Sequence, residues 1–129
     1  MMLDVLCVED DPDIRFILEL VAAEQSDICC RFAEDSASAK KLIQQMPPQL
    51  MLLDRMLPDQ NGLDFLAELQ NDRSMPSIPA IIMSARLEDL KVRSSALAGV
   101  IGFIEKPFDA PRLFQQVIQI WQNYMAQPG

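Results

Sequence analysis

The chain has 129 residues and a formal net charge of −8. Half of the residues are hydrophobic and 23% are charged, which is typical of one globular domain with its own core and not of a disordered chain. The acidic surface would repel a phosphate backbone, so direct binding of nucleic acid is not expected. The sequence contains no histidine, which excludes imidazole as a base, a metal ligand or a phosphoryl carrier.

The cysteines and the apolar segments indicate in which cellular compartment the protein works. Cys7, Cys29 and Cys30 are odd in number and lack CxxC spacing, so neither a disulfide framework nor a zinc site is predicted. No apolar run approaches the roughly 20 residues that span a bilayer, and the amino terminus turns acidic where a signal peptide would be basic. These features favour a cytoplasmic protein that does not enter a membrane.

Apolar segments and segments with helical periodicity alternate along the whole chain. In chain order, the expected elements are a strand over 3–8, a helix from Pro12, a strand over 27–33, a helix over 36–45, a strand over 49–54, a helix over 61–70, a strand over 78–85, a helix over 87–98, a strand over 100–105 and a helix over 109–125. We read one domain over residues 1–129, with an ordered core over about 3–125 and a tail or linker start over 126–129.

The expected helices have recognisable starts and buried faces. Asp11 is a plausible cap for the first helix, Pro12 fits its first turn, and Ser36 is expected to cap the second helix. The first helix is expected to bury Ile14, Ile17, Leu18 and Val21. The last helix is expected to bury Leu113, Val117, Ile120 and either Trp121 or Tyr124.

Near-continuous apolar strands that alternate with helices favour a parallel sheet covered on both faces. The predicted fold class is therefore α/β, a three-layer, doubly wound sandwich of five strand–helix units. In such sheets ligands bind beyond the carboxyl ends of the strands.

Polar residues gather at these expected strand ends. Glu9 and Asp10 follow the first strand, Asp54 ends the third, Ser84 ends the fourth, and Lys106 follows the fifth. Three carboxylates held together would repel one another unless a cation joined them, which suggests Mg²⁺, or Mn²⁺ in its place. Such a site favours Asp54 as the acceptor of a phosphoryl group, although an aspartate at this place could by itself be an ordinary turn residue.

Four motifs in these segments, in this order, resemble the receiver domain of two-component response regulators, in the chemotaxis-regulator-like superfamily. They are "LCVEDDPDIR" (6–15), "LLDRMLPDQNGLDFL" (52–66), "IIMSA" (81–85) and "GFIEKPF" (102–108). The resemblance covers essentially the whole chain. It implies a flavodoxin-like fold with strand order 2-1-3-4-5.

The resemblance also assigns expected roles around the acidic cluster. It implies that Asp54 is phosphorylated, that Asp10 binds magnesium directly, and that Glu9 acts largely through a metal-bound water. The backbone carbonyl of Met56 would be a further metal ligand, and Ser84 would bind the phosphoryl group.

Three further expectations concern the fifth strand and its end. The resemblance implies that Lys106 pairs with the phosphoryl group and that the Lys106–Pro107 peptide bond is cis. Phe103 lies at the position of the family's switch aromatic, which would move as Ser84 moves.

The sequence departs from common family patterns at several places. Met56 and Arg86 stand where side chains flank the water that attacks the phosphoryl group, and a thioether orients water poorly, so slow self-dephosphorylation is expected. Ile101, Gly102 and Gln116 replace charged residues of a known dimer face, so that dimer mode is not expected.

The resulting functional prediction is a phosphorylation-activated signalling switch and not an enzyme with an external substrate. A sensor histidine kinase or a histidine phosphotransfer protein would supply the phosphoryl group. The face of the fourth helix, fifth strand and fifth helix would then control a downstream protein or a linked output domain. Two alternatives are a constitutive interaction module with an unused site and a magnesium-dependent phosphatase, the latter weakened by Met56 in place of a second acid.

Overall fold

The structure is a computed structural model that describes residues 2–85 and 99–127. Within these residues, five strands form one parallel sheet in the order β2-β1-β3-β4-β5, as predicted. The strands are β1 (Leu3–Val8), β2 (Ile28–Ala33), β3 (Leu50–Asp54), β4 (Ala80–Ser84) and β5 (Val100–Glu105). The winding direction reverses between β1 and β3, so the carboxyl ends of these two strands border the position where such sheets bind ligands.

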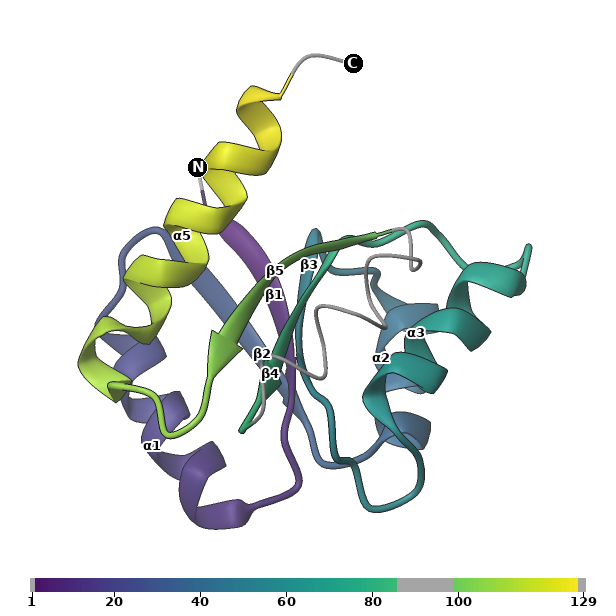
Figure 1. Cartoon of the computed structure of the whole chain (residues 1–129), viewed down its shortest axis with the longest axis horizontal. Helices are drawn as coiled ribbons and strands as arrows, with labels where there is room; N and C mark the ends of the chain where they lie inside the picture. Colours follow the sequence, from purple (N-terminus) through teal and green to yellow (C-terminus); the bar gives the residue numbers. More distant parts are fainter. Residues whose placement is uncertain (1, 86–98, 128–129) are drawn as a thin grey trace.

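Four helices within the described residues cover the two faces of the sheet. They are α1 (Pro12–Ala23), α2 (Ser36–Gln45), α3 (Gly62–Asn71) and α5 (Ala110–Ala126). Helices α1 and α5 lie on one face, and α2 and α3 lie on the other (Figure 1). The helix expected over 87–98 falls outside the described residues. No helix in the described part of the chain is both long and apolar enough to cross a bilayer.

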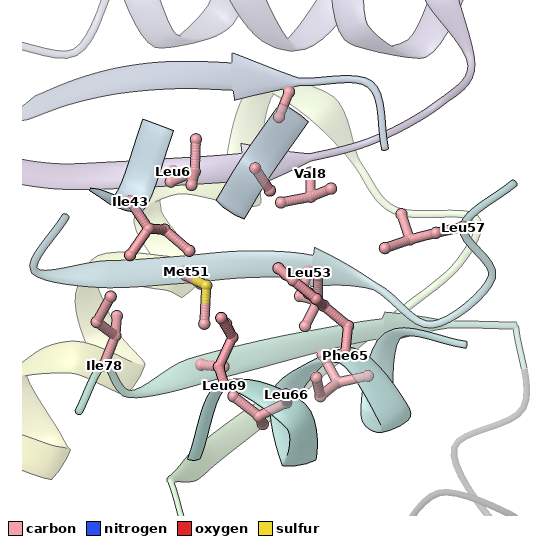
Figure 2. Packing of buried hydrophobic residues seen from close by; sticks show 14 of the residues in the cluster. Leu6, Val8, Ile43, Met51, Leu53, Leu57, Phe65, Leu66, Leu69 and Ile78 are labelled. Carbon is pink, nitrogen blue, oxygen red and sulfur yellow. The ribbon is translucent and has the colours of Figure 1, made fainter. Parts of the chain in front are cut away.

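Each face of the sheet has its own hydrophobic core. Leu6 and Val8 of β1 pack with residues of α2 and α3, and Figure 2 shows this cluster around Leu53 and Phe65. The alternating residues Val5 and Cys7 belong to the opposite cluster with α1 and α5. Every residue of β3 is buried, which explains why this strand reads as a continuous apolar run that ends in a carboxylate.

The expectations for the helix starts are confirmed at α1 and wrong at α2. Asp11 caps α1 by accepting hydrogen bonds from the backbone N–H groups of Asp13 at 2.9 Å and Ile14 at 3.3 Å. The cap of α2 is Asp35, which accepts from the Ser38 N–H at 2.8 Å. Ser36 is instead the first helical residue, because its hydroxyl donates to Asp59 in the β3–α3 loop.

The buried faces of α1 and α5 also differ from those that hydrophobic periodicity predicts. Ile17 of α1, expected in the core, is 46% exposed. In α5, Leu113 and Val117 are buried as predicted, and Phe114 is buried with them. Tyr124 is exposed because α5 continues past the edge of the sheet (Figure 1).

Candidate functional site

The polar residues of four strand ends meet at one edge of the sheet. Asp54 is the last residue of β3 and Ser84 the last of β4, and both side chains are buried. Glu9 follows β1 and is only 1% exposed, whereas Asp10 beside it is exposed. These four side chains lie in one cavity of about 660 Å³. It is lined by Glu9, Asp10, Asp11, Ile14, Asp54, Arg55, Met56, Ser84, Ala85 and Lys106.

Lys106 joins the two buried carboxylates of this cavity. Its Nζ donates to Oδ2 of Asp54 at 2.7 Å and to Oε1 of Glu9 at 2.9 Å. The other oxygen of Asp54, Oδ1, accepts a hydrogen bond from the backbone N–H of Met56 at 3.1 Å. Both oxygens of Asp54 are therefore held in defined directions by groups from two different chain segments.

The site has unusual proton affinities because charges are enclosed together. Burial and the neighbouring carboxylate of Asp54 raise the pKa of Glu9 to about 7, although Lys106 acts in the opposite direction. Partial burial acts to lower the pKa of Lys106, but its hydrogen bonds to Asp54 and Glu9 outweigh this effect and raise that pKa. The carboxylates of Glu9 and Asp54 therefore repel each other, and the ammonium group of Lys106 offsets this repulsion only in part.

The same carboxylates fit a hard divalent cation. Glu9, Asp10 and Asp54 each offer an oxygen atom, and these three oxygens lie within 4.8 Å of one another. Carboxylate oxygens are the ligands that Mg²⁺ and Mn²⁺ prefer, and Mg²⁺ retains several waters when few protein ligands are available. The exposed Asp10 leaves one side of this group open to solvent.

The loop after β3 is tied tightly to the acceptor strand. The Gly62 N–H donates to the Arg55 carbonyl at 2.6 Å, and Met56 forms an isolated antiparallel bridge with Asn61. A Cβ atom at position 62 would lie 2.3 Å from the carbonyl oxygen of Asp54, so only glycine permits this close approach. The loop thereby places Met56 at the mouth of the cavity, where its side chain is 68% exposed.

Asp59 anchors the tip of the same loop to helix α2. Its carboxylate accepts hydrogen bonds from the Ser36 hydroxyl at 2.6 Å and from the N–H groups of Ser36 at 3.1 Å and Ala37 at 3.2 Å. Desolvation acts to raise the pKa of Asp59, but the hydrogen bonds from Ser36 and Ala37 together outweigh it and lower that pKa. Sequence reasoning missed this role, since nothing in the local pattern shows that the loop reaches α2.

The remaining predicted residues have different positions. Phe103 lies in β5, is partly buried and packs against the cluster beneath α2 and α3. The Lys106–Pro107 bond is cis, as the resemblance implied. Arg86 lies outside the described residues. Arg15, which sequence reasoning passed over, reaches back from α1 to the turn that carries Glu9 and Asp10.

The chain is similar to known proteins both in sequence and in fold. The profile of the response regulator receiver domain matches residues 5–118. The receiver domain of NtrX from Brucella abortus shares 30% identity and a TM-score of 0.75, covering 92% of this chain and 98% of that one.

Longer curated proteins also match. A protein-glutamate methylesterase/protein-glutamine glutaminase from Burkholderia lata is 35% identical over 104 residues, or 80% of this chain and 28% of that protein. The transcriptional regulatory protein DcuR of Escherichia coli O6:H1 is 29% identical over an alignment that covers 95% of this chain and 51% of that protein. The chain thus spans about a quarter to a half of these relatives.

The sheet order, the acidic group at its switch point and the match over residues 5–118 agree. The chain belongs to the response regulator receiver domain family of two-component signalling.

Proposed function

We propose that this receiver domain works as a switch in which Asp54 accepts a phosphoryl group from a phosphohistidine donor. The observation that carries the proposal is the setting of Asp54: a buried carboxylate, bonded to Lys106 at 2.7 Å and grouped with the acids Glu9 and Asp10. Family membership supports phosphorylation-activated signalling in general.

In the proposed reaction, a carboxylate oxygen of Asp54 attacks the phosphorus atom of the donor. A new oxygen–phosphorus bond forms and the phosphorus–nitrogen bond to the donor histidine breaks. The donor ring, which carries a proton on its other nitrogen, leaves as neutral imidazole with that bonding pair. The donor histidine does not lie within residues 1–129, because they contain none. The Met56 N–H holds Oδ1 of Asp54, so one oxygen stays oriented while the other reacts.

The chain's own residues would manage the charge of this step. Glu9 and Asp10, with the backbone carbonyl of Met56, would hold Mg²⁺ or Mn²⁺ beside Asp54. When bound, the ion would neutralise the repulsion between the carboxylate nucleophile and the anionic phosphoryl group. Lys106 would turn from Asp54 to a phosphoryl oxygen, and the hydroxyl of Ser84, at the end of β4, would bind another.

An apolar groove beside the site supports a protein as the donor. Ile17 of α1 and Pro107 and Phe108 after β5 line a groove of about 480 Å³. This groove shares Ile14, Ala85 and Lys106 with the acidic cavity. On the outer surface of α1, Phe16 is 60% and Leu20 is 55% exposed. Apolar side chains exposed in this way favour docking of a partner. We place a sensor histidine kinase or histidine phosphotransfer protein there.

The consequence of phosphorylation would be a change in the surface read by a partner. Ser84 and Lys106 make the contacts that would differ between the two states, and differential contacts are the means by which a modification shifts a conformational equilibrium. Phe103, which is partly buried and lies beside Ile82 of β4 in the sheet, would move with Ser84. The partner is a downstream protein or a linked output domain in the cytoplasm. Similar segments occur in the matched methylesterase and in DcuR, whose names describe different activities.

Transfer of label from ³²P-acetyl phosphate tests the proposal. We expect stable labelling of the wild-type protein with Mg²⁺, loss of labelling in Asp54→Asn, and strong reduction in EDTA. Asp64→Asn, an exposed acid in the first turn of α3, is the matched control and should label normally. Labelling that persists in Asp54→Asn would contradict the assignment of the acceptor, and a wild-type chain that never takes up label would favour a constitutive interaction module.

A further inference from the structure

Arg15 of helix α1 binds the backbone of the turn that carries two of the site's acids. Its Nη1 donates to the carbonyl oxygen of Glu9 at 3.0 Å and lies 3.4 Å from the carbonyl oxygen of Asp10. The Arg15 side chain is partly buried, and its own N–H donates to the Asp11 carbonyl at 2.9 Å. The guanidinium therefore closes a ring between the first turn of α1 and the end of β1.

The choice of carbonyl partners is informative because carboxylates lie close by in sequence. Asp10, Asp11 and Asp13 all neighbour Arg15, yet across residues 2–85 and 99–127 no ion pair within 4.0 Å joins Arg15 to an acid. A guanidinium that served charge balance would be expected to face a carboxylate. Arg15 instead supplies the donor that the carbonyl of the buried residue Glu9 needs.

The other contacts that hold this turn leave it dependent on Arg15. The Glu9 N–H donates to the Ala33 carbonyl at 3.0 Å, and the Asp11 N–H donates to Oε2 of Glu9 at 3.3 Å. Neither contact fixes the peptide plane after Glu9, which sets the direction in which the Asp10 side chain leaves the backbone. Arg15 fixes that plane by binding the Glu9 carbonyl oxygen, which lies in it, and it also contacts the Asp10 carbonyl oxygen of the next peptide.

We infer that Arg15 is a positioning residue that holds the β1–α1 turn so that the carboxylates of Glu9 and Asp10 face Asp54 as a metal-binding group. The inference rests on the proposed function and deepens it. It also separates two physical effects of opposite sign. As a cation near the site, Arg15 would weaken the binding of Mg²⁺ by repulsion, whereas as a positioning group it strengthens this binding.

The test measures Mg²⁺ binding by calorimetry in wild-type protein and three variants. In Arg15→Gln, which removes the charge and shortens the side chain, we expect the Mg²⁺ dissociation constant to rise about tenfold, the usual size of such an outer contact. Arg15→Lys keeps the charge and can reach one carbonyl. Its Mg²⁺ dissociation constant should therefore lie between those of the wild type and Arg15→Gln. Arg31→Gln is the matched control: it removes a partly buried arginine that pairs with Asp4 at 3.1 Å in another part of the sheet, and it should bind Mg²⁺ normally.

Unchanged or tighter Mg²⁺ binding in Arg15→Gln would overturn the inference, because charge removal alone predicts that result. Amide hydrogen exchange in EDTA gives a second measurement that needs no metal. The N–H groups of Glu9 and Asp11 should exchange faster in Arg15→Gln and not in Arg31→Gln. If wild-type protein bound no Mg²⁺, the proposed metal site would be wrong, and the exchange rates would still decide whether Arg15 orders the turn. Equal protection in Arg15→Gln would then overturn that role.

Discussion

The ammonium group of Lys106 lies 2.7 Å from Oδ2 of Asp54 and 2.9 Å from Oε1 of Glu9, so one cation links carboxylates at the ends of two neighbouring strands. Both carboxylates are nearly buried, whereas the Lys106 side chain is 21% exposed. A buried acid that loses its cationic partner is left with uncompensated desolvation. The arrangement predicts how the protein without metal responds to substitution and to pH.

Lys106→Gln should destabilise the metal-free protein at pH 7.5 by on the order of 1 kcal/mol, since it removes charge-assisted hydrogen bonds to two acids. The loss is limited because Glu9 can take up a proton. Urea unfolding in EDTA measures the effect. Lys40→Gln is the control, because Lys40 lies 3.9 Å from its acidic neighbours in pairs that are more exposed than those of Lys106, and its loss should change stability little. Equal losses in the two variants would count against a special role of Lys106.

Stability without metal should fall as the pH rises from about 4.5 to about 7. Folded Glu9 keeps its proton until its raised pKa of about 7, whereas unfolded glutamate releases it near its ordinary value of 4.5. Between these values the folded state binds more protons, so the free energy of unfolding decreases with rising pH. Glu9→Gln should lack this contribution. Urea unfolding in EDTA at several pH values, compared between wild type and Glu9→Gln, tests it; parallel pH profiles would contradict the raised pKa.

Asp59→Ala should lower the free energy of unfolding by about 1 kcal/mol, the typical cost of a lost helix cap. It leaves the N–H groups of Ser36 and Ala37 at the start of α2 without their carboxylate partner. Chemical denaturation measures the change. Asp64→Ala, in the first turn of α3, is the control and should cost only a few tenths of a kcal/mol through the helix dipole.

The phosphorylated protein should lose its phosphoryl group slowly, over many minutes or longer. The exposed thioether of Met56 at the cavity mouth cannot orient an attacking water. Met56→Asn should accelerate the loss of label by about tenfold, which corresponds to about 1.4 kcal/mol in the barrier. Met46→Asn changes an equally exposed methionine at the end of α2 and should leave the rate unchanged. A wild-type lifetime of seconds would refute this account.

Much of the fold followed from patterns that act locally. The strands inside the sheet were recognisable because a parallel strand that is buried on both faces must be apolar throughout, as in Leu50–Asp54. Asp11 was recognisable as a cap because it lies directly before the first helical residue, Pro12. Ser36 was misjudged because its hydroxyl binds Asp59, a residue from a distant loop.

The sequence by itself determined which chemical groups stand at the strand ends, because strand length and side-chain alternation are local properties. It therefore identified Glu9, Asp10, Asp54, Ser84 and Lys106 as members of one candidate site. Only the tertiary structure decided how they meet: that Lys106 bridges Glu9 and Asp54, that Asp59 ties the acceptor loop to α2, and that Arg15 holds the acidic turn. Those contacts depend on the relative placement of elements far apart in the chain, which hydrophobic periodicity does not specify.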